Sequence, residues 1–166
     1  TGICPPPYRV LAISFKSDAA DNLAARVRKR CPPDLANRFT SLTFDSFTKG
    51  LVDRFQAAIP VAWRPTRPYD VAFPKRYQVE QSIARARQNS SVQWQATIGR
   101  YSSETFESLK VGAYRLPIAR NAPQSAEEFA IHHWWIEQLE RQPNSGLTFV
   151  SLNRLAELLL RSNPHI

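Results

Sequence analysis

Two short stretches of the sequence place a phenylalanine among hydroxyl side chains. Phe15 lies in the stretch Ser14–Ser17, and Phe44 lies in the stretch Thr43–Ser46. Hydroxyl groups and the ammonium group of Lys16 suit the oxygens of a phosphate, and an aromatic ring suits the face of a nucleobase. The alternative is a pair of ordinary turns, in which the hydroxyls cap helices and the rings are buried. The residues by themselves leave both interpretations open.

The elements around the first stretch are typical of an α/β protein. Val10–Ile13 is an unbroken apolar run, which suits a strand buried on both faces of a parallel sheet. A helix capped by Ser17 or Asp18 is expected to follow and to end before Pro32. Its apolar side is formed by Ala20, Leu23, Ala24 and Val27. The cations of its last turn, which suit the helix dipole, are Arg26, Arg28, Lys29 and Arg30.

The second stretch repeats this architecture. Thr40–Thr43 is a short β-prone run, and Phe44–Ser46 forms a turn with helix-capping character. The helix that follows ends before Pro60, and its apolar face is formed by Phe47, Leu51, Phe55 and Ala58. Ligands of open α/β sheets bind beyond the carboxyl ends of the strands. Both phenylalanines are therefore expected where a ligand would bind.

The stretch Arg9–Val27, RVLAISFKSDAADNLAARV, resembles motif Ia of the UvrD/Rep-type superfamily-one DNA helicases. The matching positions are Ser14, Phe15, Ala19, Ala20, Leu23 and Arg26. Lys16–Asp18 stands where the family usually has Thr-Asn-Lys, and Asn22 stands where it has Glu.

The second stretch looks like the Thr-Phe-His-Ser motif of the same helicases, with Asp45 in place of the His. In that family the two turns line a track for single-stranded DNA across the first RecA-like domain, called 1A. The resemblance therefore implies DNA contacts from Phe15, Lys16, Ser17, Thr43, Phe44 and Ser46. Asp45 is left out because a carboxylate repels phosphate. An alternative interpretation makes Phe44 a core residue under the sheet.

Residues 60–76 differ in composition and are expected to form a proline-rich linker or a long ordered loop, because four prolines interrupt them. Basic and aromatic residues alternate in this segment, and such a pattern can hold a nucleic-acid strand. Arg64 and Arg67 are therefore further candidate DNA contacts, on an exposed basic rim. The rings can equally pin the segment to the fold, which is the role expected of Trp63.

From Tyr77 onward the pattern is helical. One helix is expected to reach about Gln88 before a break at Asn89–Ser91, with Val79, Ile83 and Ala86 or Arg87 on its apolar face. Ser103 is expected to cap another helix, and Ser125 with Glu128 forms a capping box for the next. On that next helix the expected apolar face holds Phe129, His132 or His133, Ile136, and Leu139 or Glu140, with Trp134 and Trp135 adding area. The last helix, Leu147–Arg161, follows a turn at residues 144–146 and buries Leu152, Leu155, Leu158 and Leu159.

The resemblance implies a domain order for the whole chain. Residues 1–59 correspond to part of domain 1A, residues 77–146 to a helical insertion subdomain called 1B, and residues 147–166 to a helix that returns towards 1A. The expected fold class is α/β and mostly α, with two βα units of a RecA-like P-loop NTPase domain. Because the truncated sheet has open edges, we expect self-association through those edges or a locally altered βα region.

Composition indicates a globular protein with a polyanionic partner. The chain has 166 residues, 43% of them hydrophobic, and a net charge of +8. Residues 1–59 and 60–120 are basic, with nets of +4 and +6, whereas residues 121–166 carry −2. The charge makes nucleic acid the leading candidate partner, and the alternative is a generally basic surface of a soluble protein. The resemblance implies that this partner is single-stranded DNA, and no membrane partner is expected. Cys4 and Cys31 lack metal-ligand spacing and are interpreted as free thiols of a cytoplasmic protein.

Catalytic motifs of a helicase motor are not found in this sequence. No lysine follows a glycine, so there is no Walker A loop, and no Asp-Glu pair provides a Walker B acid. The chain has no Met and starts at Thr1, which fits a piece of a longer polypeptide. The resemblance implies a parent that binds ATP and Mg and translocates 3′ to 5′ on DNA during repair or replication. For this chain we expect no ATP hydrolysis, no catalytic residue, no bound cofactor and no metal.

Two alternatives stay open from the sequence. The parent can be a helicase–nuclease subunit of the AddA or RecB kind, which shares motif Ia. The chain can also be a stand-alone basic nucleic-acid-binding module without a motor. His132 and His133 are adjacent, so they point to different sides of a helix and are expected to be structural.

Overall fold

The structure is a computed structural model that describes residues 4–65, 68–117, 123–140 and 145–166. The chain divides into two compact units, Thr1–Leu51 (unit 1) and Val52–Ile166 (unit 2). Its fold is α/β and mostly helical, with two separate pairs of short parallel strands. The fold class expected from the sequence is confirmed at this level.

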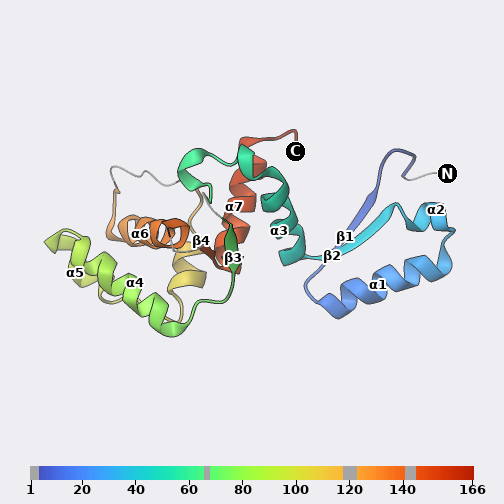
Figure 1. Ribbon diagram of the computed structural model, residues 1–166. Coiled ribbons are helices and arrows are strands. Elements are labelled where there is room, and N and C mark those ends of the chain that lie inside the picture. Colours follow the sequence, from blue (N-terminus) through green and yellow to red (C-terminus); the bar gives the residue numbers. More distant parts are fainter. Residues whose placement is uncertain (1–3, 66–67, 118–122, 141–144) are drawn as a thin grey trace. The chain divides into compact units, whose positions relative to one another are not determined.

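Unit 1 contains both expected βα units. Its elements in order are β1 (Val10–Ser14), α1 (Ser17–Arg30), α2 (Pro33–Ala36), β2 (Phe39–Thr43) and the first part of α3 (Phe44–Phe55). β1 and β2 pair in parallel, from Val10 opposite Phe39 to Ser14 opposite Thr43. α1 lies along this pair, as Figure 1 shows, and it ends before Pro32 as expected. The parallel pairing and the helix between the strands are therefore confirmed.

Burial in unit 1 differs from the expectation. Among its described residues only Ala20 and Thr48 are buried. Val10, Leu11 and Ile13 of β1 are 44–47% exposed, so the prediction of a strand buried on both faces is wrong here. The reason is geometric: one helix covers one face of a two-stranded sheet, and no other described element of unit 1 forms a layer over the remaining surface. Each strand also has a partner on one side only.

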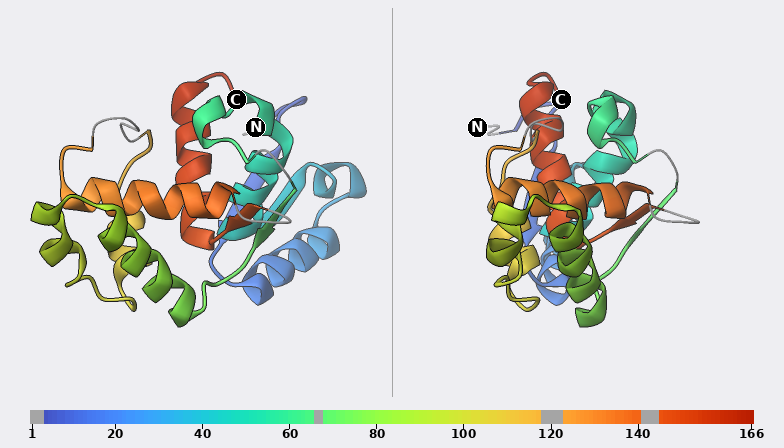
Figure 2. Two further views of the ribbon diagram at one scale, coloured as in Figure 1. Left: turned by 60° about the vertical axis from the view of Figure 1, so that its left-hand side comes forward. Right: turned by 90° about the vertical axis from the view of Figure 1, so that its left-hand side faces the viewer.

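Unit 2 holds the remaining helices and a second strand pair. Its elements after α3 are η1 (Gln56–Ala58), η2 (Val61–Trp63), β3 (Tyr69–Val71), α4 (Arg76–Asn89), α5 (Val92–Ile98), the π-helical turn η3 (Phe106–Val111), α6 (Ala126–Glu140), β4 (Ser145–Leu147) and α7 (Phe149–Ser162). β3 and β4 pair in parallel, from Tyr69 opposite Ser145 to Val71 opposite Leu147. Figure 2 shows α4 and α6 side by side.

Two segments of unit 2 differ from their sequence-based expectation. Residues 60–76 contain η2 and β3 where a linker or loop was expected. Ser145 and Gly146 lie in β4 rather than in a turn, and Asn144 lies outside the described residues. The two strands have one cause: β3 and β4 pair with each other, and a strand whose partner is remote in sequence is not visible in the local pattern.

Aromatic rings form the centre of unit 2. Trp63, Trp134, Trp135 and Phe106 are each at most 2% exposed. The rings of Trp63 and Trp135 meet edge to face at 5.8 Å, and those of Phe106 and Trp134 at 6.1 Å. Such pairs add to the hydrophobic stabilisation from the buried area. Unit 2 therefore has a dense core of its own.

Helix faces in unit 2 were predicted with mixed success. The expected apolar positions of α7 are all buried, and so are Val79, Ile83 and Ala86 of α4. For α6 the prediction is confirmed at Trp134, Trp135 and Leu139 but wrong at Phe129 and Ile136, which are half-buried. The other buried residues of α6 are Ala126, Ala130 and Ile131. The two tryptophans determine this face, because their large rings gain the most from burial.

The described helices include none whose length and apolarity would let it cross a membrane. Cys4 and Cys31 carry free thiols.

Candidate nucleic-acid interface

The parallel pairing in unit 1 brings the two phenylalanine-containing stretches to the same edge of the sheet. Ser14 and Thr43 are direct partners in the last row of the β1–β2 ladder. Phe15 and Phe44 are the next residues along the two strands, so both follow the same carboxyl end. We call this region, residues 14–17 and 43–46, the strand-end site. It brings together six of the residues that sequence reasoning selected for DNA contact.

Exposure separates the two interpretations of Phe15. Its side chain is 95% exposed, so the alternative of a buried ring in an ordinary turn is wrong. Phe44 is 39% exposed, which also places it outside the core. An exposed phenylalanine at the carboxyl end of a parallel strand has one face and edge free to stack on a flat ligand such as a nucleobase.

Hydroxyl groups at the strand-end site organise the starts of α1 and α3. Ser14 Oγ accepts a hydrogen bond from the Lys16 N–H at 3.2 Å. Thr43 Oγ1 accepts from the Ser46 N–H at 3.1 Å and donates to Ser46 Oγ at 2.8 Å. Ser17 makes no side-chain hydrogen bond within the described part of the chain, and it is exposed. The prediction that Ser17 or Asp18 caps α1 is wrong, because the capping position is Lys16, with no side-chain bond.

These caps leave hydrogen-bonding capacity at the edge of the sheet. The first N–H groups of α1 have no side-chain acceptor, and a helix start attracts negative charge. Lys16 is exposed beside them. The strand-end site therefore offers a ring, hydroxyls and amide donors at one place.

Net charge at the strand-end site is not positive. Lys16 is its one cation, and Asp45 is its one carboxylate. Long-range attraction of a polyanion therefore does not originate here. Binding at this edge would depend on short-range stacking and hydrogen bonds.

Arg64 does not form the exposed rim that was expected of it. The Arg64 guanidinium donates to the carbonyl of Ile59, from Nε at 3.1 Å and from Nη2 at 2.8 Å, and also to the carbonyl of Ala57. Arg64 is half-buried, so its prediction as an exposed DNA contact is wrong. Arg67 lies outside the described residues. Trp63 is 2% exposed, which confirms that it pins this segment to the fold.

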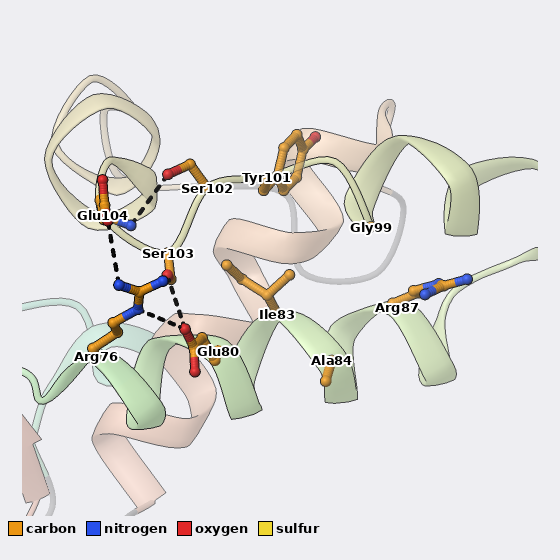
Figure 3. A pocket seen from close by; sticks show the side chains of 10 residues that line it. All are labelled: Arg76, Glu80, Ile83, Ala84, Arg87, Gly99, Tyr101, Ser102, Ser103 and Glu104. Atoms are coloured by element: carbon orange, nitrogen blue, oxygen red, sulfur yellow. Dashed lines mark hydrogen bonds and ion pairs between the residues drawn. The ribbon is translucent and has the colours of Figure 1, made fainter.

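A pocket of about 470 Å³ opens in unit 2 between α4 and the segment after α5. Figure 3 shows Arg76 directed between Glu80 and Glu104, which it meets at 2.8 and 3.4 Å. The two acids raise the pKa of Arg76 through hydrogen bonding and charge, and Arg76 in turn lowers the pKa of Glu80. Charges in this pocket thus compensate each other. We do not include it in the nucleic-acid interface.

The two histidines of α6 point in different directions, as expected. The His132 ring lies 6.2 Å from the Trp63 ring, whereas His133 contacts Asn89 at 3.2 Å and Glu137 at 3.6 Å. Burial lowers the pKa of His133, Glu137 raises it, and the Arg85 cation lowers it further. In the described ranges no three His, Cys, Asp or Glu side chains are grouped so as to hold a metal ion.

The geometry of the strand-end site is suited to binding. It combines an exposed ring with hydroxyls at one edge of the sheet. Sequence reasoning named the cations of the last turn of α1 but assigned them to the helix dipole alone, and it did not connect them with Arg9 and Arg38, which precede β1 and β2 at the same end of unit 1. No protein-family model and no curated protein matches the chain.

Proposed function

We propose that this chain is a segment of an ATP-dependent UvrD/Rep-type DNA helicase, and that its strand-end site binds single-stranded DNA. Unit 1 would belong to the RecA-like domain 1A, and unit 2 would include the helical subdomain 1B. ATP and Mg would be bound by other parts of the parent. The chain itself would contribute DNA binding and no catalytic residue.

The exposure of Phe15 carries this proposal. A ring that is 95% exposed gains nothing from the core, and its position beyond a parallel strand is where α/β folds bind ligands. The strand register sets Ser14 opposite Thr43, so the second stretch, residues 43–46, lies at the same edge of the sheet as Phe15. Stacking on such a ring tolerates any base, which suits a protein that moves along DNA of every sequence.

The exposed apolar surface of the β1–β2 pair gives further support. Val10 points to one face of the sheet and Leu11 and Ile13 to the other, and all three are close to half exposed. Parallel strands are usually covered on both faces and extended by further strands. A larger RecA-like sheet around β1 and β2 would supply these neighbours.

Binding of a labelled single-stranded oligonucleotide tests the proposal. We expect Phe15→Ala to weaken binding about 5- to 150-fold, since stacking contributes about 1–3 kcal/mol per base. Phe15→Trp should retain binding because it keeps a stacking ring. Fluorescence anisotropy at low salt measures both.

Phe73→Ala is the matched control, because Phe73 is 81% exposed and lies in unit 2. Its removal should leave affinity unchanged. Equal affinities of Phe15→Ala, Phe73→Ala and the unchanged chain would contradict a DNA track over the strand-end site.

The sequence of the parent gene distinguishes the related alternatives. A Walker A loop upstream and a Walker B strand downstream support the helicase. A C-terminal nuclease domain would point to an AddA- or RecB-like subunit instead. Their absence on both sides would leave a stand-alone basic module without a motor.

A further inference from the structure

Cations of unit 1 gather at the end opposite to the strand-end site. α1 runs back from the carboxyl ends of the strands, so its last turn lies near their amino ends, as Figure 1 shows. With 14 residues, α1 separates the two ends by about 21 Å. We call the region formed by the last turn of α1, α2 and the residues before β1 and β2 the basic end.

The charged side chains of the basic end are almost all cationic. Its cations are Arg9, Arg26, Arg28, Lys29, Arg30 and Arg38. Asp34 is its one carboxylate. The strand-end site, by contrast, has one cation and one carboxylate. The positive potential of unit 1 therefore arises almost entirely at the basic end.

The helical cations are available to a ligand. Arg26, Arg28, Lys29 and Arg30 are exposed, and none of them forms an ion pair with any described residue. They leave the helix in several directions, so they surround its last turn rather than form one stripe. The helix dipole accounts for a preference for cations here, but not for four of them in a region with a single carboxylate.

Arg9 and Arg38 add two further positive charges, and their hydrogen bonds go to backbone carbonyls rather than to carboxylates. Arg9 donates to the carbonyl of Asn37 at 3.1 Å, and Arg38 donates to the carbonyls of Cys4 and Tyr8, both at 2.6 Å from Nη2. Carbonyl oxygens fix the direction of a guanidinium but do not cancel its charge. These bonds also hold the segment before β1 against the start of β2, next to the Tyr8 ring, which is 66% exposed.

We propose that the basic end binds the phosphodiester backbone of a single-stranded nucleic acid, with Arg26, Arg28, Lys29 and Arg30 contacting phosphates and Tyr8 available for stacking. Arginine-rich clusters suit phosphates because guanidinium groups bond two oxygens at once. An anionic membrane is a poorer fit. The exposed positions of this turn are cationic, and Val27 is half-buried, so the last turn of α1 has no apolar face to insert.

The proposal concerns a surface separate from the strand-end site, so it does not depend on the proposed function. Its signature is salt dependence, because each phosphate contact on a single strand contributes about −0.7 to the slope of log K against log salt concentration. We expect the fourfold Arg26→Gln, Arg28→Gln, Lys29→Gln, Arg30→Gln variant to reduce the size of this slope by about 1 to 3. Affinity for an oligothymidine of about 20 nucleotides should fall at least about tenfold at low salt.

Three further variants separate the effect of the position of the cations from the effect of total charge. Arg87→Gln with Arg100→Gln removes two exposed arginines of unit 2 that have no ion pair among the described residues, and should leave the slope unchanged. Arg26→Gln with Arg30→Gln removes the same charge at the basic end and should reduce the slope by about 1. Replacing Arg26, Arg28 and Arg30 by Lys keeps the charge and should keep most of the slope. Circular dichroism verifies that α1 stays folded in each variant.

The outcomes also separate this proposal from the proposed function. Phe15→Ala should weaken binding without changing the salt slope, whereas the fourfold variant should change the slope. Their free-energy effects should add, because the two surfaces are far apart. An unchanged slope in the fourfold variant would overturn the proposal, and so would retention on phosphatidylserine vesicles with no affinity for the oligonucleotide.

Discussion

In unit 2 the rings of Trp63, Trp134 and Phe106 are almost completely shielded from solvent, whereas in unit 1 the ring of Phe15 is 95% exposed. The described residues of unit 1 bury one apolar side chain, Ala20, while helices α4, α6 and α7 of unit 2 each bury several. Both units pair two parallel strands. Similar local elements therefore coexist with very different degrees of burial.

This difference separates structural from functional roles. Buried area is the main source of stability, so unit 2 holds the features expected of an independently stable fold. Unit 1 instead presents rings, hydroxyls and unpaired cations to solvent. We expect substitutions in unit 2 to act on stability, and substitutions in unit 1 to act mainly on binding.

The largest expected effect is the loss of a central ring in unit 2. Trp134→Ala should lower the free energy of unfolding by about 3–5 kcal/mol, because it leaves a cavity among fully packed neighbours. Phe15→Ala should change it by less than about 0.5 kcal/mol. All four tryptophans of the chain lie in unit 2, so denaturant unfolding followed by tryptophan fluorescence reports on that unit. Equal changes in the free energy of unfolding for the two substitutions would contradict the difference in burial between unit 1 and unit 2.

A matched pair of leucines tests the same contrast with one chemical change. Leu155 of α7 is 0% exposed and Leu11 of β1 is 45% exposed. Leu155→Ala should cost about 2–5 kcal/mol. Leu11→Ala should cost less than half of that, since its methyl groups already contact water. Hydrogen exchange of peptides from each unit gives the local stability in both variants. A larger loss for Leu11→Ala would indicate that β1 is covered in solution.

Two threonines at helix starts offer a smaller comparison. Thr148 is 3% exposed, and its Oγ1 accepts from the Ser151 N–H at 3.1 Å at the start of α7. Thr43 makes the corresponding bond to Ser46 at the start of α3. Thr148→Ala should cost about 1–2 kcal/mol and Thr43→Ala about 0.5–1 kcal/mol, because only the first leaves a buried N–H without its acceptor. Urea titrations followed by circular dichroism distinguish the two values.

The smallest effect concerns pH and also belongs to unit 2. Burial lowers the pKa of His133, so the unfolded chain binds this proton more readily than the folded one. Stability should therefore fall as the pH drops below about 6.5, and it should rise again as the pH is increased. His133→Gln should weaken this dependence between pH 5.5 and 7.5, roughly the range in which an ordinary histidine titrates. Because all three histidines lie in unit 2, hydrogen exchange corrected for intrinsic rates should show no histidine-linked change in unit 1.

Local sequence determined the elements of this chain to a large extent. α1 ends before Pro32, Ser90 and Ser91 separate α4 from α5, and the leucines of α7 lie on one buried face. The two βα units and their parallel pairing also follow from local pattern. Periodicity, prolines and capping residues act between neighbours a few positions apart, so they are visible without a fold.

Contacts between remote segments decided what the sequence left open. β3 exists because β4, a segment remote in sequence, pairs with it. The helix α5 was missed, since its few apolar residues gain their positions from α4 and α6.

The candidate site shows the same division. The sequence by itself determined which residues follow the two strands of unit 1, because a strand and the turn after it are local features. Only the tertiary structure decided that Phe15 is exposed and that the cations of α1 lie far from it, at the opposite end of the sheet. Exposure and charge distribution depend on every neighbouring layer, and residue order along the chain does not specify which neighbours are present.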